Sequence, residues 1–88
     1  MKLYLIHCGF YDEEISDGIY EFHVNIPVIA GDVDEAKQKV RLVPQFVTKK
    51  MHIDGIQELE SVDGYIISFV KKENDEETSI QYIRHRDL

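Results

Sequence analysis

The chain has 88 residues, with 10 lysines and arginines against 17 aspartates and glutamates, which gives a formal net charge of −7. This length predicts a single domain spanning residues 1–88, because a chain this short rarely builds two hydrophobic cores. The acidic balance argues against nucleic-acid binding, which depends on clustered basic side chains. The single cysteine, Cys8, excludes an intramolecular disulfide and a cysteine-rich zinc site.

The first ten residues, MKLYLIHCGF, contain a lysine followed by a short apolar run. The run is too short for the apolar region of a signal peptide and leads into acidic residues, so we interpret it as a strand. No stretch approaches the roughly 20 apolar residues that span a bilayer. Together with the single cysteine, these features predict a cytoplasmic protein without membrane contact.

Two strands are predicted in the first third of the chain. Residues 2–8 are apolar on both alternating faces, which favours a central strand covered above and below. Residues 10–18 hold four acidic side chains and predict a loop. Residues 19–26 alternate between apolar and polar, as in a half-buried antiparallel strand paired with the first. Pro27 has no amide proton and is expected at a strand end or a sheet edge.

A helix is predicted next, in the segment DVDEAKQKVRLV. Asp32 with Glu35 three positions later resembles a capping box. An apolar stripe at helical spacing contains Val33, Ala36, Val40 and Val43. Pro44 disfavours helical geometry in the residue before it, so the helix is expected to end near Leu42. Residues 45–50 are then expected to lead on to the next strand.

A β-hairpin is predicted over residues 51–70. The first strand carries His52 and Asp54, and residues 61–64, Ser-Val-Asp-Gly, fit a type I turn followed by a left-handed glycine. Residues 65–70 form the return strand. The charged residues 71–79, with Asn74 and Asp75 at their middle, predict an exposed turn. Residues 80–83 predict a short last strand, and residues 84–88 a tail that frays or contacts a partner.

These elements predict an α+β fold. The expected architecture is a mainly antiparallel sheet of four to five strands with one helix packed on one face. The order is strand-strand-helix-strand-strand, with the short last strand after it. One helix of about three turns cannot cover both faces of such a sheet. A second copy is the simplest cover, so the sequence predicts a homodimer, the twofold arrangement being the commonest.

The best candidate site combines residues from two strands. His52 and Asp54 are two positions apart and therefore project to one face, as do Glu21 and His23. If the two strands are close and their polar faces agree, the four side chains converge. Such a set could hold a divalent metal, with His23, His52 and Asp54 as ligands, or form a histidine–carboxylate acid–base pair. The alternative is a set of solvated or hydrogen-bonded residues on an open sheet face or in a dimer interface.

Three stretches of the chain resemble a known family. They are KLYLIHCG, then EFHVNIPVIAG followed by DVDEAKQKV, and MHIDGIQELESVDGYII. They resemble the bacterial DUF1543 family, and the chain is similar to a single-copy member. The resemblance implies a bacterial protein without an assigned activity, in which Gly9, Glu21 and His23 match the family pattern. The sequence departs from that pattern at Phe10, Val24 and Ile56.

The function expected from the sequence is a small, non-enzymatic, dimeric binding or interaction module whose small-molecule ligand is unknown. The motifs of phosphate loops, nucleophile elbows and serine–histidine–aspartate triads are absent from the sequence. The alternative is a small metal-binding or acid–base enzyme that uses Glu21, His23, His52 and Asp54. The cofactor is unknown and the sequence implies none strongly, although these residue types could hold a divalent metal. Cys8 is expected in the core, because free cysteine is among the most buried residue types.

Overall fold

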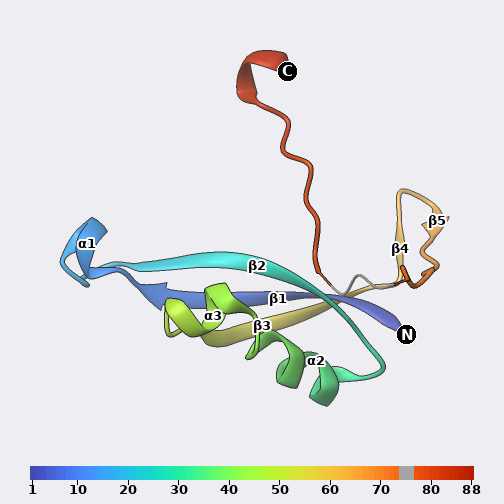
Figure 1. Cartoon of the computed structure of the whole chain (residues 1–88), viewed down its shortest axis with the longest axis horizontal. Coiled ribbons are helices and arrows are strands. Elements are labelled where there is room, and N and C mark those ends of the chain that lie inside the picture. Colours follow the sequence, from blue (N-terminus) through green and yellow to red (C-terminus); the bar gives the residue numbers. More distant parts are fainter. Residues whose placement is uncertain (74–76) are drawn as a thin grey trace.

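The computed structural model describes residues 1–73 and 77–88 and shows an antiparallel sheet, a separate small hairpin and short helices (Figure 1). The strands are β1 (Lys2–Tyr11), β2 (Glu21–Ala30), β3 (His52–Leu59), β4 (Ser61–Val62) and β5 (Tyr65–Ile66). The helices are α1 (Glu13–Ser16), α2 (Val33–Val40), α3 (Pro44–Thr48) and the 3₁₀ turn η1 (His85–Asp87). The predicted α+β class is confirmed.

The main sheet has the order β2-β1-β3, and both pairings are antiparallel. The expectation that the first strand is central is therefore confirmed, and Pro27 lies on an edge strand as predicted. The expectation that both faces of this strand are covered is wrong within the described chain, because Leu3 and Leu5 on its second face are only half-buried and His7 is exposed. One face of the sheet forms the core. Its buried residues are Tyr4, Ile6, Cys8, Phe10, Ile26, Val28 and Ala30, joined by Ala36, Val40 and Met51. The opposite face carries the remaining side chains of β1, including His7.

Helix α2 begins where the sequence predicts it. The Asp32 carboxylate accepts a hydrogen bond from the Glu35 amide at 2.8 Å, and the Glu35 carboxylate accepts one from the Gly31 amide at 3.1 Å. These contacts satisfy amides that a helix N-terminus otherwise leaves without partners. Ala36 and Val40 are fully buried, so this part of the predicted apolar stripe faces the sheet, whereas Val33 at the start of the helix is 44% exposed. The regular helix ends at Val40, two residues before the predicted end.

The prediction of a single helix is wrong. Helix α2 ends at Val40, and Pro44 begins a second helix, because proline at the first helical position loses no hydrogen bond. Residues 45–50, expected to lead on to a strand, therefore lie largely in α3. The acidic loop likewise contains α1, whose N-terminus is capped by Asp12 accepting from the Glu14 amide at 3.0 Å. Within the described residues, no helix is long and apolar enough to cross a membrane.

The C-terminal third also differs from the prediction. Asp63 and Gly64 have φ values of 53° and 83°, which is the pattern of a two-residue type I′ turn rather than type I followed by glycine. The turn joins β4 to β5. β5 ends at Ile66, so the predicted return strand over residues 65–70, paired with the strand that carries His52, does not form. Residues 80–83 form no strand, so the sheet has three strands and not four to five. Asn74 and Asp75 of the predicted turn lie outside the described residues.

Candidate functional site

The strand register brings the two predicted residue pairs to the same place. Gly9 on the central strand lies opposite His23 of β2 on one side and opposite His52 of β3 on the other. Glu21 and Asp54 lie two positions from these histidines on their own strands and project to the same face. The structure therefore gathers all four candidate side chains above β1, although β2 and β3 are separated by β1 and share no backbone pairing.

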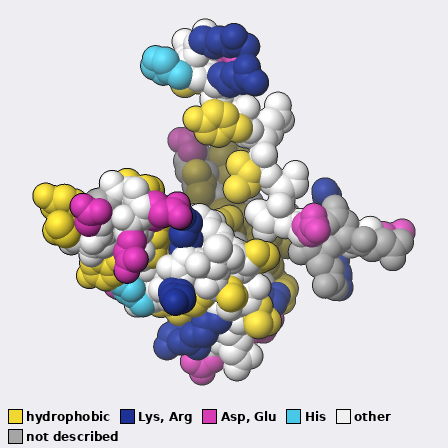
Figure 2. Space-filling view, turned by 60° about the vertical axis from the view of Figure 1, so that its left-hand side comes forward, with side chains coloured by type: hydrophobic (Ala, Val, Ile, Leu, Met, Phe, Trp, Pro, Cys, Tyr) yellow, Lys and Arg dark blue, Asp and Glu magenta, His cyan; other side chains and the backbone are white. Residues whose placement is uncertain are grey.

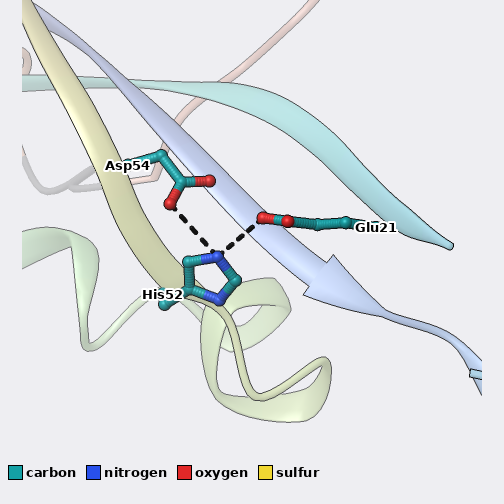
Figure 3. Close-up of side chains that lie close together, drawn as sticks. All are labelled: Glu21, His52 and Asp54. Carbon is teal, nitrogen blue, oxygen red and sulfur yellow. Dashed lines mark hydrogen bonds and ion pairs between the residues drawn. The ribbon is translucent and has the colours of Figure 1, made fainter. Parts of the chain in front are cut away.

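The four side chains form a closed ring of nitrogen–oxygen contacts. The His52 Nε2 atom lies 2.7 Å from Glu21 Oε1 and 3.2 Å from Asp54 Oδ1 (Figure 3). The His23 Nε2 atom lies 3.0 Å from the same Glu21 oxygen and 3.1 Å from Asp54 Oδ2. Each imidazole thus contacts both carboxylates, and each carboxylate contacts both imidazoles.

A β-bulge in β3 positions Asp54. Gly55 lies opposite His7 and Ile53 lies opposite Cys8, so Asp54 is the one residue between them that has no partner on β1. An extra residue of this kind bends the strand and redirects its side chain, which is why bulges are frequent beside functional sites. The bulge therefore accounts for the approach of Asp54 to the same two imidazoles that Glu21 contacts.

Gly9 forms the floor beneath the ring. A β-carbon placed on Gly9 would lie 2.6 Å from both Asp54 Oδ2 and His52 Nε2, and closer still to Glu21 Oε1. Any side chain at this position would push the ring atoms aside. The sequence resemblance marked Gly9, but only the register shows that the glycine leaves room for the site.

Two further residues on the same face of β1, His7 and Tyr11, contact the ring, and neither is among the candidate residues that the sequence indicated. The Tyr11 hydroxyl donates to Glu21 Oε2 at 3.4 Å. The ring of His7 stacks on His23 with centroids 4.8 Å apart, while His7 Nδ1 lies 2.8 Å from Asn25 Oδ1. The available signal was the two-residue alternation of β1, which places residues 7, 9 and 11 on one face.

The ring is accessible and rich in acceptors. The exposed fractions of its side chains range from 29% for Glu21 to 46% for His52. Each Nε2 atom carries at most one proton, so two protons at most serve the four nitrogen–oxygen contacts. Glu21, His52 and Asp54 each offer a ligand atom within 4.8 Å of the others, which is a spacing that can hold a metal ion.

No family model, curated protein or solved structure matches the chain. The resemblance to DUF1543 therefore stays a prediction. The chemistry of the site is interpreted from its own side chains and their contacts.

Cys8 takes no part in the ring. Its side chain is fully buried on the opposite face of β1, where the thiol lies 3.6 Å from the Ile6 carbonyl oxygen. Burial raises the pKa of the Cys8 thiol, and the charge of Asp54 raises it further. The thiol is therefore protonated at neutral pH, and its place on the core face of β1 separates it from the ring. The prediction of a core cysteine is confirmed.

Proposed function

We propose that the chain is a metal-binding module that holds one divalent transition-metal ion, Zn²⁺ first among them, through Glu21, His23, His52 and Asp54. The observation that carries the proposal is the closed ring of contacts above Gly9, in which two imidazole nitrogens lie 2.7–3.2 Å from oxygens of two carboxylates.

The spacing of the ring atoms supports a tetrahedral ion. Zinc binds imidazole nitrogen and carboxylate oxygen at about 2.0–2.1 Å, which places neighbouring ligand atoms of a tetrahedron about 3.3 Å apart. The four nitrogen–oxygen separations of the ring, 2.7–3.2 Å, are slightly shorter than this value. The ligand atoms that all lie within 4.8 Å of one another are those of Glu21, His52 and Asp54, so these three form the core of the site and His23 completes it after a small rotation of its side chain. Imidazole ligands also favour zinc and neighbouring transition metals over magnesium and calcium, which prefer oxygen.

The charge of the ring supports the same ion. The two carboxylates carry two negative charges. Two neutral imidazoles carry no charge to balance them and can donate at most two protons to the carboxylate oxygens. A divalent cation replaces those protons, neutralises the carboxylates and satisfies all four ligand atoms at once. Metal binding then competes with protonation of His23 and His52, so the affinity is expected to fall as the pH is lowered.

The direct test is isothermal titration of chelator-treated protein with Zn²⁺. We expect one ion per chain, and a loss of affinity of at least about tenfold for His23→Ala and for His52→Ala, since each removes one ligand. The matched control is His85→Ala, which removes a histidine in η1 rather than in the ring. Thermal unfolding without metal checks that the variants fold.

A second measurement reports the coordination itself. Co²⁺ in place of Zn²⁺ gives intense visible absorption when four ligands surround it tetrahedrally, and weak absorption when water completes an octahedron. We expect intense absorption for the wild type and the His85→Ala variant, and weak absorption for His52→Ala. The proposal is wrong if the wild type takes up no Zn²⁺, or if the ring variants bind it as tightly as the control.

A further inference from the structure

The outer edge of β3 can accept another strand. Among the described residues, β3 pairs with β1 alone, which leaves one row of its amides and carbonyls without a strand partner. The other edge of the sheet is β2, which contains Pro27, a residue without an amide proton to donate to a neighbouring strand. No proline interrupts β3. After the bulge at Asp54, residues 55–59 form the longest regular stretch of this edge.

The C-terminal residues 77–88 form an arm that leaves the body of the molecule. Figure 1 shows this arm running away from the sheet and ending far from β3. The radius of gyration is 15.1 Å, whereas a compact domain of this length has a value of about 12 Å. The excess agrees with a segment that extends outward and is not folded back on its own sheet.

The arm has the composition of a strand but forms none. Ile80 is 75% exposed, Tyr82 84% and Leu88 86%, although β-branched and aromatic residues are the types that sheets favour. Figure 2 shows hydrophobic side chains along the projecting part of the molecule and basic side chains with a histidine at its tip. An exposed apolar segment of this kind commonly marks an interaction site.

Charge complements the apolar character of the arm. The arm ends in Arg84 and Arg86, while the accepting edge carries Glu58 in β3 and Glu60 directly after it. Glu58 also contacts Lys2 at 3.4 Å and Arg86 contacts Asp87 at 4.0 Å, so Arg84 and Glu60 carry the complementarity. Opposite charges across an interface favour one partner and one orientation. The chain as a whole is acidic, so the basic end of the arm is attracted to the body of another copy.

We propose that residues 80–83 of one copy pair as a strand with residues 55–59 of β3 in a second copy. The two copies are related by a twofold axis, and the arm of each pairs with β3 of the other. Such an exchange of identical segments is a common route to a homodimer. The exchange extends the sheet to β2-β1-β3-arm and covers the exposed side chains of the arm. The exchange uses none of the four ring residues, Glu21, His23, His52 and Asp54. The dimer is therefore expected to form or fail independently of metal binding.

The test is the mass of the full chain in solution, measured by light scattering across the micromolar range without metal. We expect twice the chain mass of 10.3 kDa. In a strand, the amides of successive residues point to opposite edges, so the double variant Ile80→Pro/Gln81→Pro removes one donor from each edge of the arm. This variant is expected to be a monomer. The control is Ile15→Asp, which changes an apolar side chain that is 66% exposed in α1 and is expected to stay a dimer.

Amide hydrogen exchange identifies the accepting strand. In the wild type, the outward amides of residues 55–59 are expected to exchange slowly, and in the double variant they are expected to exchange faster. A monomeric wild type overturns the proposal, even where these amides are protected, because the arm then pairs with its own sheet. A double variant that stays dimeric overturns it as well.

Discussion

The imidazole of His7 lies flat against that of His23, with ring centroids 4.8 Å apart and ring planes within 4° of parallel. His7 is also held by the contact between its Nδ1 atom and Asn25 Oδ1 at 2.8 Å. The stack therefore restrains the ring plane of His23 while its Nε2 atom faces Glu21 and Asp54. His7 acts as a positioning residue for the proposed metal ligands.

Removing this stack is expected to weaken metal binding without removing a ligand. We expect His7→Ala to lower the Zn²⁺ affinity about tenfold, the lower end of the range for residues that orient ligands. His7→Phe keeps a flat ring against His23 and is expected to retain most of the affinity. A competition titration with a chromophoric chelator measures both. Equal affinities for wild type and His7→Ala would show that the stack does not position His23.

Gly9→Ala is expected to abolish metal binding while leaving the fold stable. The new methyl group displaces the ends of three flexible side chains, those of Glu21, His52 and Asp54, rather than backbone atoms. Titration with Zn²⁺ and thermal unfolding without metal measure the two effects separately.

The matched control for this substitution is Gly55→Ala, on the neighbouring strand. A β-carbon at Gly55 meets the His7 β-carbon at 3.9 Å, an ordinary van der Waals contact. This variant is expected to bind Zn²⁺ like the wild type. Unchanged binding by Gly9→Ala would contradict the placement of the site above Gly9.

The contact between Asp12 and Lys49 makes stability depend on pH. The Lys49 ammonium donates to Asp12 Oδ2 at 2.9 Å, which lowers the pKa of Asp12 below its ordinary value of 3.8 and raises that of Lys49 above 10.5. The carboxylate therefore contributes stability above pH 3.8 that is lost as the pH falls through its lowered pKa. The ammonium contributes stability below pH 10.5 that is lost as the pH rises through its raised pKa.

Asp12→Asn removes this charge but keeps a side chain that caps helices well. We expect a lower urea midpoint than the wild type at pH 7 and a difference that vanishes in strong acid. Asp17→Asn is the control, because Asn also tolerates the left-handed conformation of residue 17. A midpoint difference for Asp12→Asn that stays constant from neutral to strongly acidic pH would contradict the role of the ion pair.

Ile6→Ala is expected to destabilise the fold by about 2–5 kcal/mol, the range for truncating large aliphatic side chains in a core. Ile6 is fully buried in the middle of β1 and lies between Ile26 and Ile56 of the flanking strands. Leu42→Ala truncates an exposed side chain and should change the free energy of unfolding little. Chemical denaturation of both variants gives the comparison, and similar losses would place the core elsewhere.

Local patterns in the sequence predicted much of the sheet and the helix on it. The two-sided apolar run of β1, the alternation before Pro27 and the capping pair of Asp32 and Glu35 each depend on a few neighbouring residues. Local chemistry determines such features. The arm shows the opposite case, since residues 80–83 have strand composition but lack a partner strand within the described chain. Strand formation requires pairing, which composition alone does not supply.

The candidate ligands were also predicted, but their convergence was not. Alternation placed Glu21 with His23 and His52 with Asp54 on common faces. Whether the two pairs meet depends on the registers of β2 and β3 against Gly9 and on the bulge at Asp54. Those registers are set by long-range packing, so the sequence indicated the residue types of the site and the fold supplied their geometry.

The four residues of the ring come from the two edge strands of the sheet, which has a mechanical consequence for a bound ion. Its ligands come from both edge strands, with Glu21 and Asp54 separated by most of β2, two helices and the start of β3. An ion held by both edges is a reversible cross-link that clasps the sheet around its middle strand. It closes a long loop of chain, as a disulfide does in secreted domains of similar size, but with a bond that opens when the metal is removed.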